Sequence, residues 1–268
     1  MESKGLWFNT ISQINNKLNE MIIKQIKKLA NVIYIKLHEK KYQNRLRYLF
    51  CNNNSDVLFV VFPAFTGEKR RYNYIKGLMR YKVDKLFLLD DFGVKGSYLL
   101  FEDGDDTPRK LTIGLLSELI SKKKYEKTIF MGTSKGGSCA IYYGLEFNAN
   151  YILAGACQYN LGSYLHREDH EDIFKGMMGQ NASQQESDIL NKIMPNQLKK
   201  HSGSNSFVFN IYSEKELTYQ RQIIDLNKKM KECNIKHENV VLDFENHDDV
   251  GIHFLQYIHK NLSKLITK

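Results

Sequence analysis

The chain has 268 residues and a mass of 31.4 kDa, enough for one large domain or two small ones with a buried core. Hydrophobic residues make up 42% and charged residues 26%, which excludes collagen-like, disordered and coiled-coil proteins. The net charge of +9 favours an anionic partner: a polyanionic glycan, a nucleotide-bearing cofactor, a membrane surface or a nucleic acid.

The cysteines and the apolar runs bear on the compartment. Cys51, Cys139, Cys157 and Cys233 are widely spaced and form neither a CxxC pair nor a metal-ligand pattern. Residues 1–16 lack the continuous apolar core of a signal peptide, and no apolar run reaches the roughly 20 residues of a membrane-spanning helix. We therefore expect a reduced, cytoplasmic protein without a metal site.

Residues 1–51 predict a helical extension ahead of the main domain. Ile22, Ile26 and Ile33 recur at helical spacing with Lys24 and Lys28 between them, which is a basic amphipathic pattern. Two interpretations remain open. The helix caps the domain, or it associates with a partner or with the anionic inner face of a membrane.

Residues 52–268 predict a single α/β domain. Short β-branched and aromatic runs predict six strands, at 57–62, 85–89, 127–132, 151–156, 207–212 and 240–244. The longer amphipathic runs predict helices, at 71–81, 106–122, 136–147, 218–233 and 250–266. Residues 161–200 carry no strand signal and predict a helical insertion or lid. This alternation implies a mostly parallel sheet with helices on both faces and reactive groups at the carboxyl ends of the strands.

A nucleophile motif follows the third predicted strand. The segment Gly132-Thr133-Ser134-Lys135-Gly136-Gly137 matches G-x-S-x-G between a strand and a helix. Glycines allow the close backbone packing of such a turn, and the amides of the following helix face a developing oxyanion. The alternative is a phosphate-binding turn, but the pattern G-x-x-x-x-G-K-[ST] is absent. We predict that Ser134 is a nucleophile.

A serine nucleophile needs a base, which in this arrangement follows a later strand. His247 lies between the last predicted strand and the last predicted helix. Of the eight histidines, only His247 lies directly on such a loop downstream of Ser134. His253 falls inside the closing helix, where packing is the simpler role. We predict that His247 is the base.

The acid that orients the base is predicted after the fifth strand. Glu216 lies a few residues beyond the strand end and 31 residues before His247 (247 − 216). Glu214 is the alternative in the same loop, and Asp248, beside the histidine, is a third. Both glutamates also fit a structural role as caps of the helix that begins near Thr218.

Two further groups of residues complete the predicted site. One oxyanion-hole amide is expected from Lys135, and a second from Ala64 or Phe65 in the loop after the first strand. Beyond that loop, Arg70 and Arg71 are expected to place cations at the mouth of the cleft, and Tyr72 an aromatic ring. Arginine suits phosphate or carboxylate recognition through its forked donors. The plainer interpretation is a solvated helix start.

The order of these motifs resembles that of a known family. Phe62-Pro63-Ala64-Phe65, Asp90-Asp91-Phe92-Gly93 with Gly96-Ser97-Tyr98, Gly132 to Gly137, Tyr212 to Tyr219 and Asn246-His247-Asp248 follow one another along the chain. Together they resemble the bacterial capsular polysaccharide biosynthesis proteins of the XcbB/CpsF type, a group related to capsule O-acetyltransferases with an α/β-hydrolase fold. The resemblance spans about residues 56–266 and leaves the N-terminal extension uncovered.

The resemblance implies a Ser-acid-His enzyme that moves acetyl from acetyl-CoA to a hydroxyl of a capsular or surface polysaccharide or its sugar precursor. A capsule-assembly complex would then be the partner of the N-terminal helix. Two other functions remain open: a serine esterase acting on a glycan or small ester, and a non-catalytic member of the fold in surface-glycan assembly or secretion. No helix-turn-helix, zinc or RNA-recognition signature is present, so we expect no nucleic-acid partner.

Overall fold

The computed structural model describes residues 18–19, 21–23, 25–26, 29, 32–65, 67 and 70–267. The chain divides into two compact units, Met1–Glu39 and Lys40–Lys268. The described residues of the first unit are helical up to His38, and their exposed large apolar side chains are Leu18, Met21, Ile22, Ile23, Ile26, Leu29, Val32, Ile33 and Leu37. No helix in the described ranges is long and apolar enough to cross a membrane.

The second unit is built on a sheet that has eight strands in the described part of the chain. The strands are β1 (Glu39–Tyr42), β2 (Leu46–Cys51), β3 (Val57–Val61), β4 (Asp84–Leu88), β5 (Lys127–Thr133), β6 (Tyr151–Gly155), β7 (Phe207–Tyr212) and β8 (His237–Val241). Their spatial order is β1-β2-β4-β3-β5-β6-β7-β8, and the pairs from β4 to β8 are parallel. The mostly parallel sheet is confirmed, with β2 antiparallel to β4.

The prediction of a helix through residue 51 is wrong for residues 39–51, which form β1 and β2. A tight turn joins the two strands: Gln43 and Asn44 have φ values of 46° and 57°, and the Arg45 N–H donates to the Tyr42 carbonyl at 3.0 Å. Positive φ at two successive turn residues matches the twist of a hairpin. Pairing of β2 with β4, whose five residues are all buried, favours strands in this segment.

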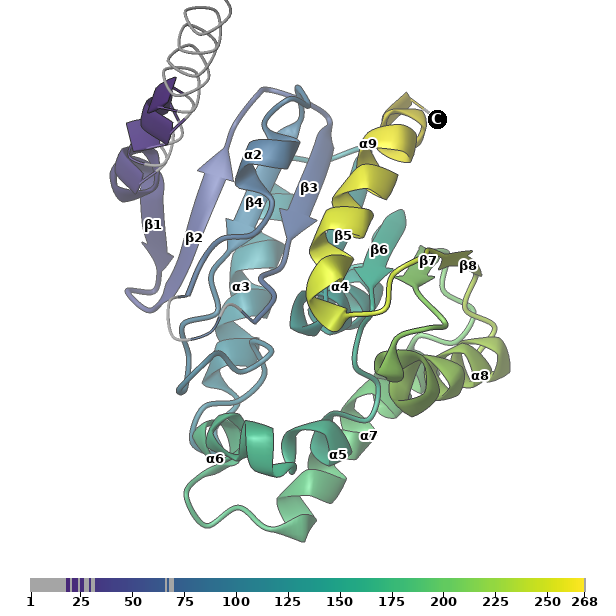
Figure 1. The fold of residues 1–268 in the computed structure, drawn as a ribbon. Coiled ribbons are helices and arrows are strands. Elements are labelled where there is room, and N and C mark those ends of the chain that lie inside the picture. The colour runs from purple at the N-terminus through teal and green to yellow at the C-terminus, as the bar shows by residue number, and fades with distance from the viewer. Residues whose placement is uncertain are drawn as a thin grey trace, which may run out of the picture. The chain divides into compact units, whose positions relative to one another are not determined.

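Helices cover both faces of the sheet, as predicted. They are α2 (Ile75–Leu78), α3 (Thr107–Lys122), α4 (Lys135–Glu146), α5 (Leu161–Leu165), α6 (Glu171–Met178), α7 (Gln184–Lys200), α8 (Ile224–Glu232) and α9 (Val250–Thr267). In Figure 1, α2 and α9 lie in front of the sheet, and α3 and α4 lie behind it. The helix expected at 71–81 is limited to one turn, and β8 begins three residues before the expected strand.

Burial explains why the central strands read as continuous apolar runs. All five residues of β4 and the last four of β3 are buried, because helices cover both faces. The insertion at 161–200 is helical as expected and consists of α5, the short turn Glu168–His170 (η1), α6 and α7.

Candidate active site

Ser134 lies at the sharp turn between β5 and α4, with φ 53° and ψ −125°. A positive φ is strained for a residue with a side chain and persists only where neighbouring packing fixes it. Glycines provide that packing here. A Cβ at Gly132 would overlap the Gly136 carbonyl, and a Cβ at Gly136 would lie 2.7 Å from the Phe62 carbonyl oxygen. The turn therefore holds Ser134 in the conformation expected for a nucleophile motif.

The structure brings Ser134, His247 and Glu216 into one hydrogen-bonded chain. His247 Nε2 lies 2.8 Å from Ser134 Oγ, and His247 Nδ1 lies 3.0 Å from Glu216 Oε1. The three residues come from the ends of three strands: Ser134 follows β5, Glu216 follows β7 and His247 follows β8. Parallel strands end at one edge of the sheet, so residues 113 and 31 positions apart meet there.

Glu216 is the acid that faces the histidine. Its side chain is 5% exposed, and its Oε1 also accepts hydrogen bonds from the N–H and the hydroxyl of Thr218. Burial by itself would raise the pKa of this carboxyl, but hydrogen bonds from His247 and Thr218 bring the pKa below its ordinary value. Glu214 is exposed, and Asp248 is exposed at the rim of the cavity described below.

The predicted oxyanion amides come from Lys135, next to Ser134 in the sequence, and from the loop after β3. Lys135 is the first residue of α4, so its N–H has no carbonyl partner within the helix. The Ala64 N–H donates to Asn73 Oδ1 at 3.2 Å, which favours Phe65 over Ala64 for the second amide. Both Ala64 and Phe65 line the cavity.

The side chain of Lys135 is buried and paired with Asp90. Its Nζ lies 2.5 Å from Asp90 Oδ2, and the two side chains are 2% and 0% exposed. Removing one partner of such a pair leaves an uncompensated buried charge, which costs about 3–5 kcal/mol. The pair therefore fixes the residue that follows the nucleophile.

A cavity of about 490 Å³ opens in front of Ser134 and His247. Its walls combine aromatic and apolar side chains (Phe65, Tyr74, Tyr164 and Ile173) with charged and polar ones (Lys95, Asp169, His170 and Asp248), and they come from both the sheet edge and the insertion. The Tyr74 hydroxyl lies 2.7 Å from Thr133 Oγ1, and burial raises the pKa of Tyr74 to about 12. Tyr74 therefore stays neutral and can act as a hydrogen-bond donor.

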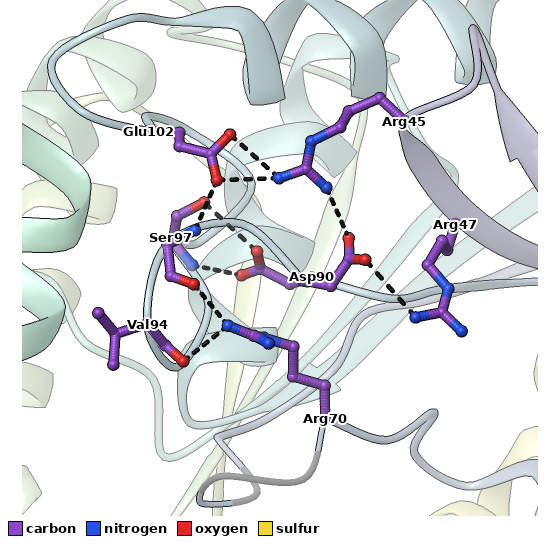
Figure 2. A network of polar contacts seen from close by, with 9 residues as sticks. Arg45, Arg47, Arg70, Asp90, Val94, Ser97 and Glu102 are labelled. Atoms are coloured by element: carbon purple, nitrogen blue, oxygen red, sulfur yellow. Dashed lines mark hydrogen bonds and ion pairs between the residues drawn. The ribbon is translucent and has the colours of Figure 1, made fainter.

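Arg70, Arg71 and Tyr72 do not line this cavity. Arg70 donates instead to the carbonyls of Gly93 and Val94, at 2.5 and 2.6 Å, in the loop after β4 (Figure 2). The Arg70 guanidinium therefore binds main-chain carbonyls of its own chain and does not face the cavity as expected. The next two residues along the chain, Asn73 and Tyr74, do reach the cavity.

Two arginines that the sequence did not single out lie close by. A cavity of about 260 Å³ shares Tyr164, Asp169, His170 and His247 with the first one and is also lined by Arg167 and Arg221. A third, of about 430 Å³, continues along both arginines. Arg221 lies on a π-helical turn, Tyr219–Ile223 (η2), a geometry frequent at functional sites. The described histidines, cysteines and carboxylates form no group of three or more that could ligate a metal.

Gln158 is the second feature missed from the sequence. It follows β6, is fully buried, and its Nε2 donates to Ser134 Oγ at 3.1 Å. No motif marks a lone glutamine after a strand. Only its place at the carboxyl end of the strand next to β5 could have drawn attention to it.

Solved structures share this fold, whereas the sequence matches no protein-family model and no curated protein. The capsule O-acetyltransferase of Neisseria meningitidis serogroup A matches with a TM-score of 0.71 and 21% identity over 86% of this chain and 94% of the other. A variant of that enzyme in complex with CoA matches with a TM-score of 0.70 and 22% identity, over 85% and 94%.

Two further structures have other roles. FphF, a fluorophosphonate-binding serine hydrolase of Staphylococcus aureus, matches with a TM-score of 0.57 and 10% identity, over 82% and 91%. The Gap123 complex of Streptococcus agalactiae matches with a TM-score of 0.66 and 17% identity, over 84% of this chain and 46% of that chain. At these identities the similarities confirm the α/β-hydrolase fold alone, which this chain shares with the capsule O-acetyltransferase and with FphF. The narrower XcbB/CpsF assignment stays a prediction.

Proposed function

We propose that this protein is a serine-dependent acyltransferase that moves acetyl from acetyl-CoA to a hydroxyl of a capsular or surface polysaccharide, or of its sugar precursor. The observation that supports it most is the chain of hydrogen bonds from Ser134 through His247 to Glu216 at the wall of a cavity. A nucleophile, a base and a group that orients the base are what covalent acyl transfer needs.

In the first half-reaction, Ser134 Oγ attacks the carbonyl carbon of the acyl thioester while its proton moves to His247 Nε2. The N–H groups of Lys135 and Phe65 donate to the oxyanion that forms. When the bond from carbon to sulfur breaks, His247 returns the proton to the leaving sulfur, and Ser134 carries the acyl group. Glu216 stabilises the positive charge that His247 bears in between.

In the second half-reaction, a sugar hydroxyl attacks the acyl carbon and gives its proton to His247 Nε2. The bond from the acyl carbon to Ser134 Oγ then breaks, and Oγ takes the proton back from His247. The acetylated sugar leaves, and the serine is restored.

The choice of donor and acceptor is supported by chemistry around the cavity. Arg167 and Arg221 offer forked donors of the kind that bind phosphate or carboxylate, as a CoA phosphate or an acidic glycan would require. The similar capsule enzyme was solved in complex with CoA, and the net charge of +9 also suits anionic substrates. A cytoplasmic location, where acetyl-CoA is available, belongs to this proposal.

A serine esterase is the second candidate, because the side chain of His247 is 33% exposed and water can reach the base. The two reactions use the same residues and differ in the acceptor. Turnover of acetyl-CoA that depends on added sugar supports the transferase, whereas equal turnover without sugar supports the hydrolase. A fluorophosphonate probe that fails to label the wild-type protein would contradict both.

We also propose that the helical first unit associates with an anionic membrane surface on which capsule assembly takes place. Nine described large apolar side chains are exposed on it, and lysines at 24, 27, 28 and 36 stand between them in the sequence. A helix of this composition binds acidic lipid through its apolar side chains and its positive charge together.

A further inference from the structure

Gln158 has an unusual position for a buried amide. It lies three residues after the end of β6, its side chain is 0% exposed, and its Nε2 donates to Ser134 Oγ at 3.1 Å. The same oxygen lies 2.8 Å from His247 Nε2. Ser134 Oγ therefore accepts one hydrogen bond from Gln158, which leaves its own proton to point at His247.

The Tyr98 hydroxyl determines which way the Gln158 amide faces. It donates to Gln158 Oε1 at 3.3 Å, whereas the Ser138 hydroxyl donates to the main-chain carbonyl of Gln158 at 2.9 Å. Burial raises the pKa of Tyr98 well above its ordinary value, so the phenol keeps its proton and acts as a donor. With Oε1 facing the Tyr98 hydroxyl, the NH₂ group faces Ser134.

The loop that carries Tyr98 is held in place by Asp90, which follows β4. Asp90 accepts from the N–H group of Ser97 at 2.8 Å (Figure 2). It also accepts from the N–H group of Leu99 at 3.3 Å and pairs with Lys135. Tyr98 has a φ of 56°, a strained conformation that such a network can hold. Asp90 thus anchors both the residue after the nucleophile and the loop that orients Gln158.

Ion pairs next to Asp90 connect the same loop to the β1–β2 hairpin. Arg45 pairs with Glu102 at 2.9 Å and with Asp91 at 3.3 Å, and Arg47 lies 3.7 Å from Asp91 (Figure 2). The Gly93 N–H donates to Glu102 at 2.8 Å. The β1–β2 hairpin therefore holds the loop after β4 in place through ion pairs. Tyr98 of this loop is hydrogen-bonded to Gln158, which is hydrogen-bonded to Ser134.

We propose that Gln158 is a further catalytic residue and that Tyr98 is the positioning residue that acts through it; the inference rests on the proposed function of Ser134. The Gln158 amide keeps the Ser134 proton directed at His247. It also stabilises negative charge on Ser134 Oγ as that proton leaves for His247, and again when the bond from Oγ to the acyl carbon breaks. A hydrogen bond to a charged oxygen is about twice as strong as a neutral one.

The test is the rate at which a fluorophosphonate probe labels Ser134, followed across pH. In this reaction Ser134 Oγ forms a bond to phosphorus, fluoride leaves, and the proton goes to His247. We expect Gln158→Met to lower the rate about 10²-fold, as removal of one donor to a reacting oxygen does, with the midpoint of the pH profile unchanged. Gln197→Met, another buried glutamine whose amide contacts Tyr142 and Glu146, is the matched control and should label at the wild-type rate.

Gln158→Glu gives a readout that a structural role would not produce. Its carboxyl keeps the shape of the amide. Once ionised, it accepts a hydrogen bond from the Ser134 hydroxyl, which turns that proton away from His247, and it repels negative charge on Oγ. Burial raises the pKa of such a carboxyl. We therefore expect the labelling rate of Gln158→Glu to fall at alkaline pH, where the wild-type rate stays level.

Tyr98→Phe should slow labelling several-fold in the wild-type background and have no further effect in Gln158→Met, because the two act as a unit. Wild-type labelling rates in folded Gln158→Met, together with a level alkaline profile in Gln158→Glu, would overturn the inference while leaving the proposed function intact. Absence of labelling in the wild-type protein would instead remove the proposed function.

Discussion

Glu216 supports His247 through a single oxygen. Its Oε1 accepts from His247 and Thr218, whereas its Oε2 is buried without a partner in the described part of the chain. The contact thus depends on the charge and placement of one atom, and a substitution that keeps the shape but removes the charge isolates its role.

Glu216→Gln should lower the rate of Ser134 acylation about 10²–10⁴-fold, because a neutral amide neither stabilises the charged imidazole nor fixes its tautomer. Stopped-flow measurement of acylation with an activated ester reports this rate. Glu214→Gln changes the exposed glutamate two residues earlier and serves as the matched control. An equal loss in both variants would mean that the wrong carboxylate has been identified.

The lowered pKa of Glu216 also predicts how stability depends on pH. The folded state holds this carboxylate below its ordinary pKa of 4.5, so its contribution to the free energy of unfolding is present above that value. The contribution is lost as the pH falls through the folded-state pKa. Thermal unfolding of wild type and Glu216→Gln should show a stability difference at pH 7 that shrinks on acidification toward pH 3; a difference that grows would contradict this linkage.

At the scale of elements, the features that could be predicted from the sequence are those that depend on a few neighbouring residues. The glycines predicted a sharp turn at Ser134, and the order of the strands predicted a loop at His247 after the last strand. The structure has both features at these positions. The hairpin at 39–51 was missed because its pairing with β4 is a long-range contact. Arg70 was assigned to the cavity because a sequence shows a residue's charge and not the direction of its side chain, which here faces the carbonyls of the loop after β4.

Arg167 lies in the helical insertion and Arg221 on the π-helical turn η2, and both line the same two cavities. Arg167 pairs with Asp169 at 2.9 Å, whereas no carboxylate among the described residues forms an ion pair with Arg221. Arg221→Gln should therefore raise the KM for the phosphate-bearing substrate about tenfold, equal to roughly 1.4 kcal/mol, and Arg167→Gln should raise it less.

Steady-state kinetics with acetyl-CoA and acceptor, compared with hydrolysis of a small neutral ester, measures this effect. The neutral ester should be turned over with unchanged kcat and KM by both variants. Arg80→Gln, an exposed arginine outside these cavities, is the matched control. A parallel loss for the neutral ester would show that the substitutions disturb the site rather than remove an anion contact.

At the scale of the whole molecule, the helical first unit predicts membrane-surface binding. The full-length chain should sediment with vesicles that contain anionic phospholipid and less with purely zwitterionic vesicles, and added salt should weaken the binding. Ile22→Asn with Ile26→Asn should reduce sedimentation several-fold. Ile189→Asn changes an apolar side chain that is also exposed, on α7, and should have no effect. Equal reduction by all three substitutions would contradict the assignment to the first unit.

The whole account depends on acyl transfer through Ser134. The most direct measurement is rapid acid quenching after mixing the protein with labelled acetyl-CoA, followed by mass spectrometry of its peptides and of added capsule oligosaccharides. We predict acetyl on the peptide that contains Ser134, its disappearance as acetylated sugar forms, and loss of both products in Ser134→Ala and His247→Ala. Acetylated sugar formed at the wild-type rate by Ser134→Ala would contradict the account.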